Sequence, residues 1–308
     1  MDFQKRKIKP LLPAGLQHIQ TREVVIEAQD GMELAGTLYQ PIQAPYASIL
    51  LNSGTGIPRT YYTGVAAYLA DQGYVVLTYD FRGVGGSRPN SLAGFQATKR
   101  DWGKLDMTAA FDRLLRDFPD IPHYVFGHSV GGQLLALMDN ADAIDGVISY
   151  GSGFGYWGNI KGSYRYFVAA MWYIGIPLFT SLFRYLPAKR FKLGEDLPSG
   201  VAHDWARWGK RPDYFIGELG THPGFSKLNC PWVALLAEDD EVATEANARP
   251  LYDLYPNADV NLRIIRPSEF DVKELGHMSF FSRKNRDAWT ILLDSVQHMK
   301  QQSNRFQA

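Results

Sequence analysis

The chain has 308 residues, in which 32 lysine and arginine side chains are balanced by 32 aspartate and glutamate side chains. This balance provides no overall field that would attract nucleic acid or an anionic membrane, so a small-molecule partner is expected and membrane association is disfavoured. The composition, 45% hydrophobic and 21% charged, is typical of a globular protein with a sizeable core. Cys230 is the single cysteine, which excludes an intramolecular disulfide.

The first 20 residues carry a basic cluster, Lys5-Arg6-Lys7, ahead of a short apolar stretch. Pro10 and Pro13 interrupt that stretch before it reaches the length of a signal peptide. We therefore expect a cytoplasmic protein with a loose N-terminal arm.

Polar and apolar residues alternate from Glu23 to Tyr39 on both sides of Asp30-Gly31, which is typical of a hairpin of two antiparallel edge strands. Apolar runs and helical patterns then alternate along the chain. This rhythm predicts a mostly parallel α/β sheet with right-handed crossovers. Buried strands are expected at 47–51 and 74–79. Further strands are expected in the run that leads into the serine motif and at 144–150, 232–237 and 260–265. Helices are expected at 60–71 and 101–118, after the serine motif, up to about Tyr255 and near the C-terminus.

The alternation stops between residues 152 and 225, where tryptophan and tyrosine are dense and several prolines divide the segment. We predict an inserted, mostly helical cap, so that residues 1–151 and 226–308 form the two parts of the core and residues 152–225 form the cap. Within it, Tyr166 to Phe183 carries no charge and approaches the length of a transmembrane helix. Gly175 and Pro177 predict two packed helices there instead.

The central motif is Gly127-His128-Ser129-Val130-Gly131, which follows a predicted strand and precedes an apolar helical stretch. A serine at the tip of such a turn lies in strained backbone geometry, where a side chain at Gly127 or Gly131 would clash. The turn exposes the hydroxyl and directs the amide of Val130 at the space beside Ser129, where an oxyanion could form. The pattern predicts a nucleophilic serine.

A serine hydroxyl needs a neighbouring base, and a carboxylate must hold that base in one tautomer. On a sheet of this kind the partners follow in the order serine, acid, histidine. Only His277 and His298 follow every candidate acid. His298 lies within the predicted final helix, whereas His277 lies in a loop after a strand, so His277 is the predicted base.

Four acidic residues, 238–241, compete for the role of the acid at the end of one predicted strand. We choose Asp240. Asp239 stays open as the alternative, because spacing does not separate neighbouring residues.

Taken together, these features resemble the α/β-hydrolase superfamily with a cap, and are most similar to a bacterial group of predicted hydrolases. The resemblance spans about residues 22–300. It is carried by the hairpin, Asn52-Ser53-Gly54-Thr55-Gly56, Tyr79-Asp80-Phe81-Arg82-Gly83-Val84-Gly85, the serine motif, Asp240 and Gly276-His277. In that superfamily the loop after the first central parallel strand supplies a second oxyanion amide, which implies one of residues 53–55 here. We choose Thr55, although Asn52-Ser53 replaces the usual His-Gly at the head of this loop.

The expected activity is cleavage of a carboxylic ester or thioester through an acyl-enzyme on Ser129, with no metal and no cofactor. Aromatic residues of the cap predict a substrate with an apolar part, unless they only form the core of the cap. These aromatic residues are Tyr156, Trp157, Trp172, Tyr173, Phe179, Trp205 and Trp208.

Three alternatives compete with the prediction of an ester hydrolase. An acyltransferase would use the same triad with an acceptor other than water, and a non-catalytic binding module would use only the fold. A dinucleotide-binding loop at 54–59 fails because Arg59 occupies the position of the third glycine. The oligomeric state is not determined by these patterns.

Overall fold

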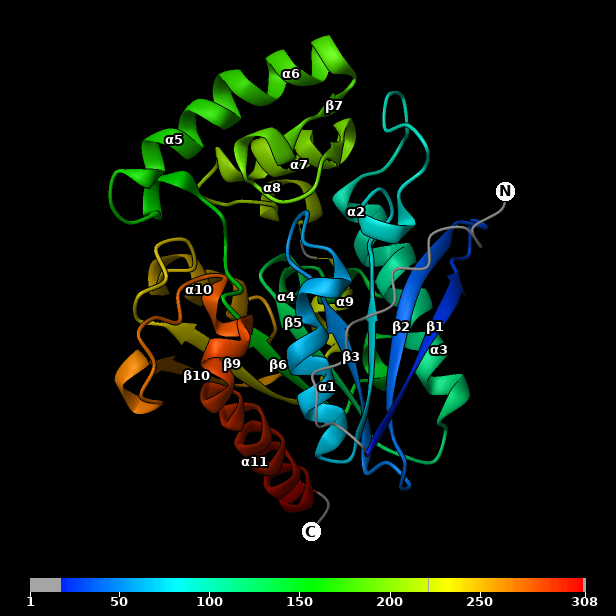
Figure 1. The fold of residues 1–308 in the computed structure, drawn as a ribbon. Coiled ribbons are helices and arrows are strands. Elements are labelled where there is room, and N and C mark those ends of the chain that lie inside the picture. Colours follow the sequence, from blue (N-terminus) through cyan, green and yellow to red (C-terminus); the bar gives the residue numbers. More distant parts are fainter. Residues whose placement is uncertain (1–17, 221, 307–308) are drawn as a thin grey trace.

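The computed structural model describes residues 18–220 and 222–306, so most of the predicted N-terminal arm lies outside the described residues (Figure 1). Its centre is an eight-stranded sheet with the strand order β1-β2-β4-β3-β5-β6-β9-β10. The strands are β1 (Ile19–Glu27), β2 (Glu33–Pro41), β3 (Ala47–Asn52), β4 (Tyr74–Tyr79), β5 (His123–His128), β6 (Gly146–Tyr150), β9 (Pro231–Ala237) and β10 (Asp259–Ile265). Among the described residues of this eight-stranded sheet, only the pairs β1–β2 and β2–β4 are antiparallel. The mostly parallel sheet with an antiparallel hairpin at its edge is therefore confirmed.

Two hydrophobic clusters cover the two faces of this sheet. Within β3, Leu50 belongs to the cluster that contains α3 (Thr108–Asp117), and Ile49 and Leu51 belong to the cluster that contains α1 (Thr63–Asp71). The C-terminal helix α11 (Thr290–Phe306) packs with the second cluster. Successive side chains of a strand point to opposite faces, so a continuously apolar strand has to be buried on both.

Most of the chain between β6 and β9 forms a separate group of helices above the sheet (Figure 1). Its helices are α5 (Tyr164–Ala170), α6 (Ile176–Phe183), α7 (Ser199–Gly209) and α8 (Ile216–Leu219), whereas α9 (Gly224–Lys227) lies in the core near α4 (Val130–Gln133). Two short strands, β7 (Tyr185–Leu186) and β8 (Leu197–Pro198), pair antiparallel within it and were not predicted. A two-residue pairing leaves no periodic signal in a sequence, because it depends on where the loop between the strands closes.

The prediction of two packed helices around Gly175 and Pro177 is wrong. Residues Tyr164–Phe183 form one helix, in which α5 and α6 are joined by a π turn, Met171–Gly175. Pro177 lies in the first turn of α6. A proline in a helix lacks one donor and clashes with the carbonyl four residues before it, and the wider π turn directly before α6 accommodates both effects.

Candidate active site

Ser129 lies at the sharp turn between β5 and α4 (Val130–Gln133). Its backbone has φ 51° and ψ −116°, a conformation that a non-glycine residue rarely adopts. A Cβ at Gly127 would lie 2.6 Å from the backbone nitrogen of Gly132, and one at Gly131 would lie 2.4 Å from the carbonyl oxygen of Asn52. The turn can therefore form only with glycine at both positions.

His277 and Asp240 meet directly. The Nδ1 atom of His277 lies 2.7 Å from Oδ2 of Asp240. A Cβ added at Gly151, directly after β6, would lie 3.1 Å from Nδ1 of His277 and 3.2 Å from Oδ2 of Asp240, so the two side chains leave room only for glycine there. Asp240 follows β9 and is 1% exposed, and its Oδ1 accepts the backbone N–H groups of Val242 and Ala243. These contacts hold the carboxylate with one oxygen directed at the imidazole.

Burial and the contact between the two side chains shift the pKa values of Asp240 and His277 in opposite directions. Burial raises the pKa of Asp240, but the charge and hydrogen bond of His277 and two backbone N–H groups together lower it below its usual value. Burial lowers the pKa of His277, and the charge and hydrogen bond of Asp240 outweigh that and raise it. The pair therefore contains an ionised acid beside a basic imidazole.

The neighbouring acid has a different position. Asp239 accepts the backbone N–H groups of Leu275 and Gly276 at 2.9 and 3.0 Å. It thus braces the loop that carries His277 without touching the ring. The other candidate base, His298, lies in α11 with its ring 3.3 Å from the side-chain nitrogen of Asn261.

Ser129 lies against the same short stretch of chain as the acid and the base. Its backbone N–H donates to the carbonyl of Tyr150, and its carbonyl accepts the hydroxyl of Ser152. Gly151 lies between those two residues, and the space that a side chain would take there is occupied by His277 and Asp240. In the described part of the chain, the Ser129 hydroxyl and His277 form no hydrogen bond with each other. Such bonds often form only when substrate is bound.

A buried hydrogen-bond chain joins the serine turn to the neighbouring loops, and sequence reasoning missed it. The backbone N–H of Gly54 donates to the Tyr62 hydroxyl at 2.8 Å, which lies 2.7 Å from Nδ1 of His128. The other ring nitrogen of His128 lies 3.0 Å from the carbonyl of His277. Burial lowers the pKa of His128 to about 3, so the ring is neutral and has one donor and one acceptor. The tautomer that fits accepts from Tyr62 and donates to His277. The position of His128 inside the serine motif was the only signal.

The same hydrogen bonds limit which backbone amide can serve as the second donor of the oxyanion hole. Because the N–H of Gly54 is already bound to Tyr62, it is not free for a ligand. The amide of Val130 is at the first position of α4, where a helix leaves its N–H groups unpaired. The hydroxyl of Ser53 is buried without a hydrogen-bond partner among the described residues. Thr55 stays our choice for the second amide.

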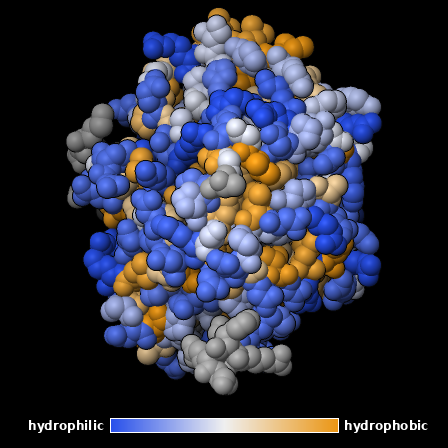
Figure 2. Space-filling view, turned by 180° about the vertical axis from the view of Figure 1, so that it is seen from behind, coloured by the Kyte–Doolittle hydropathy of each residue, from blue (hydrophilic) through white to orange (hydrophobic). Residues whose placement is uncertain are grey.

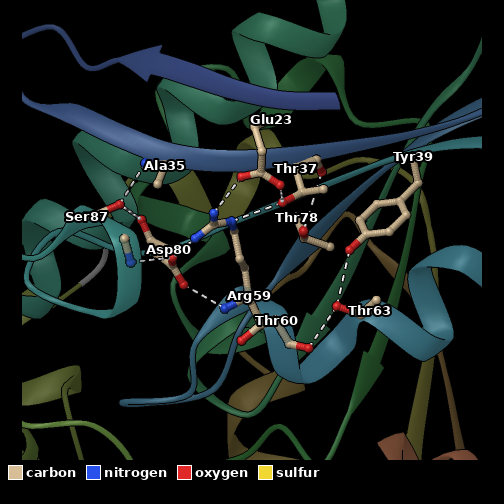
Figure 3. Close-up of polar contacts among 11 residues, drawn as sticks. Glu23, Ala35, Thr37, Tyr39, Arg59, Thr60, Thr63, Thr78, Asp80 and Ser87 are labelled. Carbon is tan, nitrogen blue, oxygen red and sulfur yellow. Dashed lines mark hydrogen bonds and ion pairs between the residues drawn. The ribbon is translucent and has the colours of Figure 1, made fainter. Parts of the chain in front are cut away.

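A buried ion pair anchors the far end of the 53–58 loop (Figure 3). The Asp80 carboxylate accepts the backbone N–H of Arg59 at 2.6 Å and also pairs with its guanidinium. That guanidinium reaches Thr37 and Glu23 on the two edge strands. Arg59 therefore connects the candidate oxyanion loop to the sheet, and Asp80 holds Arg59 in place.

The aromatic residues of the cap do not behave as one group. Trp172 and Trp208 are buried, whereas Tyr173 is 54% exposed. Trp172 and Trp205 help to line an apolar pocket of about 30 Å³ that reaches Tyr164, Phe167 and Leu193. That volume is much smaller than the roughly 300–1,000 Å³ of ordinary ligand sites, so this pocket has no room for a long acyl chain.

A second pocket of about 310 Å³ lies away from the serine. It is lined by Arg249, Tyr252, Asp253, Tyr255, Ala258, Val260 and Leu262. Among residues 18–220 and 222–306, the histidine, cysteine and acidic side chains form no group that could hold a metal ion. Burial raises the pKa of the Cys230 thiol to about 12, which makes it an inert core group.

A known protein family and several solved structures resemble this chain. A model of the family described as serine aminopeptidase, S33, matches residues 43–193. An esterase of Pyrococcus furiosus covers 92% of this chain and 94% of its own, with a TM-score of 0.58 and 16% identity. The chain belongs to the α/β-hydrolase superfamily. The sequence-based prediction of that family and fold is confirmed.

Two further proteins resemble this α/β-hydrolase, one in its structure and one in part of its sequence. A thermophilic esterase of Thermogutta terrifontis covers 90% of the chain and 99% of its own, with a TM-score of 0.57 and 19% identity. Mouse monoglyceride lipase is 29% identical over 111 residues. That match spans 35% of this chain and 35% of the mouse protein, so the two share only about a third of their lengths.

Proposed function

We propose that this α/β-hydrolase is a serine hydrolase that cleaves a carboxylic ester or thioester of a small molecule. The pairing of His277 with Asp240 at 2.7 Å, beside the strained turn of Ser129, carries the proposal. The superfamily and the names of its relatives, two esterases and a lipase, support the same class of reaction.

In the proposed mechanism, the Ser129 hydroxyl attacks the carbonyl carbon while His277 takes its proton. The amides of Val130 and Thr55 stabilise the tetrahedral oxyanion, an effect of about 3–4 kcal/mol per donor. Collapse breaks the bond to the leaving alcohol or thiol, which takes the proton from His277. Water then attacks the acyl carbon while His277 takes its proton. The bond between the acyl carbon and Ser129 Oγ breaks, His277 returns the proton to that oxygen, and the acid is released. Asp240 holds the imidazole in one tautomer throughout.

The segment 152–225 is proposed as a cap over this site. Because its apolar pocket is small, we propose that substrates with long acyl chains require the cap to move. A chain-length series of aryl esters tests this, and a preference for acetyl esters would favour a cap core without a substrate role.

The nucleophile is tested first, by reaction with a fluorophosphonate probe and measurement of intact mass. One adduct is expected on the wild-type protein and on Ser91→Ala, a matched control at an exposed serine, and none on Ser129→Ala. An adduct of equal yield on Ser129→Ala would remove Ser129 from the proposed role.

The class of substrate is tested next with an aryl ester, an acyl thioester, a monoacylglycerol and an aminoacyl anilide. Faster turnover of the anilide would favour the peptidase named by the family model. Product analysis with and without an added alcohol separates hydrolysis from acyl transfer.

A further inference from the structure

The helix formed by α5, the π turn and α6 is the most exposed apolar element of the molecule. Twelve large hydrophobic side chains are exposed in the described part of the chain, and seven of them lie on this helix. The helix passes the length and hydropathy test for a membrane span, but only 28% of its apolar window is buried. A core helix would be mostly buried, so this surface requires another explanation.

The exposed residues gather on one side of the helix, which we call the outer face. Ile174, Leu178 and Leu182 follow one another at intervals of four and are 66%, 56% and 68% exposed. This spacing places them in one stripe along a helix. Figure 1 shows α5 and α6 at the end of the molecule farthest from α11, and Figure 2 shows hydrophobic side chains gathered at the same end.

The charged residues within the segment 151–194, which contains the outer face, have one sign. Residues 151–194 contain no aspartate or glutamate, although the whole chain has equal numbers of acidic and basic residues. They contain six basic residues, at both ends of the helix: Lys161, Arg165, Arg184, Lys189, Arg190 and Lys192. Only Lys189 of these has an ion pair among the described residues, with Glu195. An apolar face flanked by cations is complementary to a surface with an apolar interior and anionic groups at its boundary.

We propose that the outer face docks this protein on an anionic phospholipid bilayer, with the helix lying in the interface. It does not cross the membrane, because its opposite side is packed in the cap through Trp172, Ile176 and Thr180. A second copy of the chain is a poorer occupant, because pairing two outer faces would bring two sets of cations together. The sequence alone disfavoured membrane association, since the balanced net charge conceals this local asymmetry.

The test is flotation of the full chain with vesicles of phosphatidylcholine, alone or mixed with phosphatidylglycerol. Binding to the mixed vesicles is expected, and weaker binding at high salt. The triple variant Ile174→Ser, Leu178→Ser and Leu182→Ser should bind at least about tenfold more weakly. A matched control replaces three exposed hydrophobic residues of the sheet region, Val25, Ile42 and Ile264, by serine, and should bind like the wild type.

Thermal denaturation of both triple variants shows whether they are folded. Ser129→Ala should bind vesicles as fully as the wild type does. This variant therefore separates loss of docking from failure of the proposed chemistry. The double variant Arg190→Gln and Lys192→Gln should lose the preference for mixed vesicles. Failure of the wild type to float with either vesicle would overturn docking, as would equal flotation of the outer-face variant. A dimer in solution that only the outer-face variant dissociates would assign the surface to a second copy instead.

Discussion

Lys99 is a buried lysine at the contact between the core and the cap helix α7. Its side chain is 1% exposed, and its ammonium lies 5.5 Å from the ring centres of both Trp205 and Trp208. Burial lowers the pKa of Lys99 to about 7, and the charge of Asp204 opposes that only in part. We expect this group to make the stability of the protein depend on pH.

The direction follows from proton binding. The unfolded chain keeps Lys99 protonated up to its ordinary pKa, 10.5, whereas the folded protein loses that proton near pH 7. Between those values the unfolded state binds more protons, so the free energy of unfolding rises with pH. From about pH 6 to about pH 9 the contribution of Lys99 is about 2–3 kcal/mol, at roughly 1.4 kcal/mol per unit of pKa shift.

The variant Lys99→Met isolates this contribution, because every other titratable group is shared with the wild type. The free energy of unfolding, measured by urea denaturation, should be higher for Lys99→Met than for the wild type at about pH 6, and the difference should shrink by about 2–3 kcal/mol at about pH 9. Lys104→Met, at an exposed lysine of the following turn, serves as the control. Parallel pH profiles for the wild type and Lys99→Met would refute the reasoning.

Three further predictions concern the site. Asp240→Asn should lower kcat by roughly four orders of magnitude through the wrong tautomer of His277, and Asp239→Asn by much less; equal losses for an aryl ester would contradict the assignment. Because Asp240 raises the pKa of His277, kcat/KM should fall with decreasing pH at a value above the roughly 6.5 of a free imidazole, and an acid limb below that value would contradict the pairing. Tyr62→Phe leaves two buried groups without a partner and should lower the free energy of unfolding by about 1–3 kcal/mol, together with kcat; an unchanged denaturation midpoint would show that the hydrogen-bond chain is not needed.

The sequence by itself determined the sheet, its edge hairpin and the serine turn, because these depend on neighbours along the chain. Burial of β3 on both faces of the sheet follows from its continuously apolar run, and the need for glycine at 127 and 131 follows from the lack of space around the turn. The order of serine, acid and histidine along the chain left His277 and His298 as candidates for the base, and the helical pattern around His298 favoured His277.

Contacts between distant segments were decided only by the tertiary structure. Adjacent residues at the end of β9 point in different directions, but which of Asp239 and Asp240 faces His277 depends on a loop 37 residues further along. The hydrogen bonds from Gly54 through Tyr62 to His128 likewise join a loop, a helical turn and the end of β5. The exposure of Leu178 also required the fold, because an apolar helix has the same sequence pattern whether it packs in a core or faces outward.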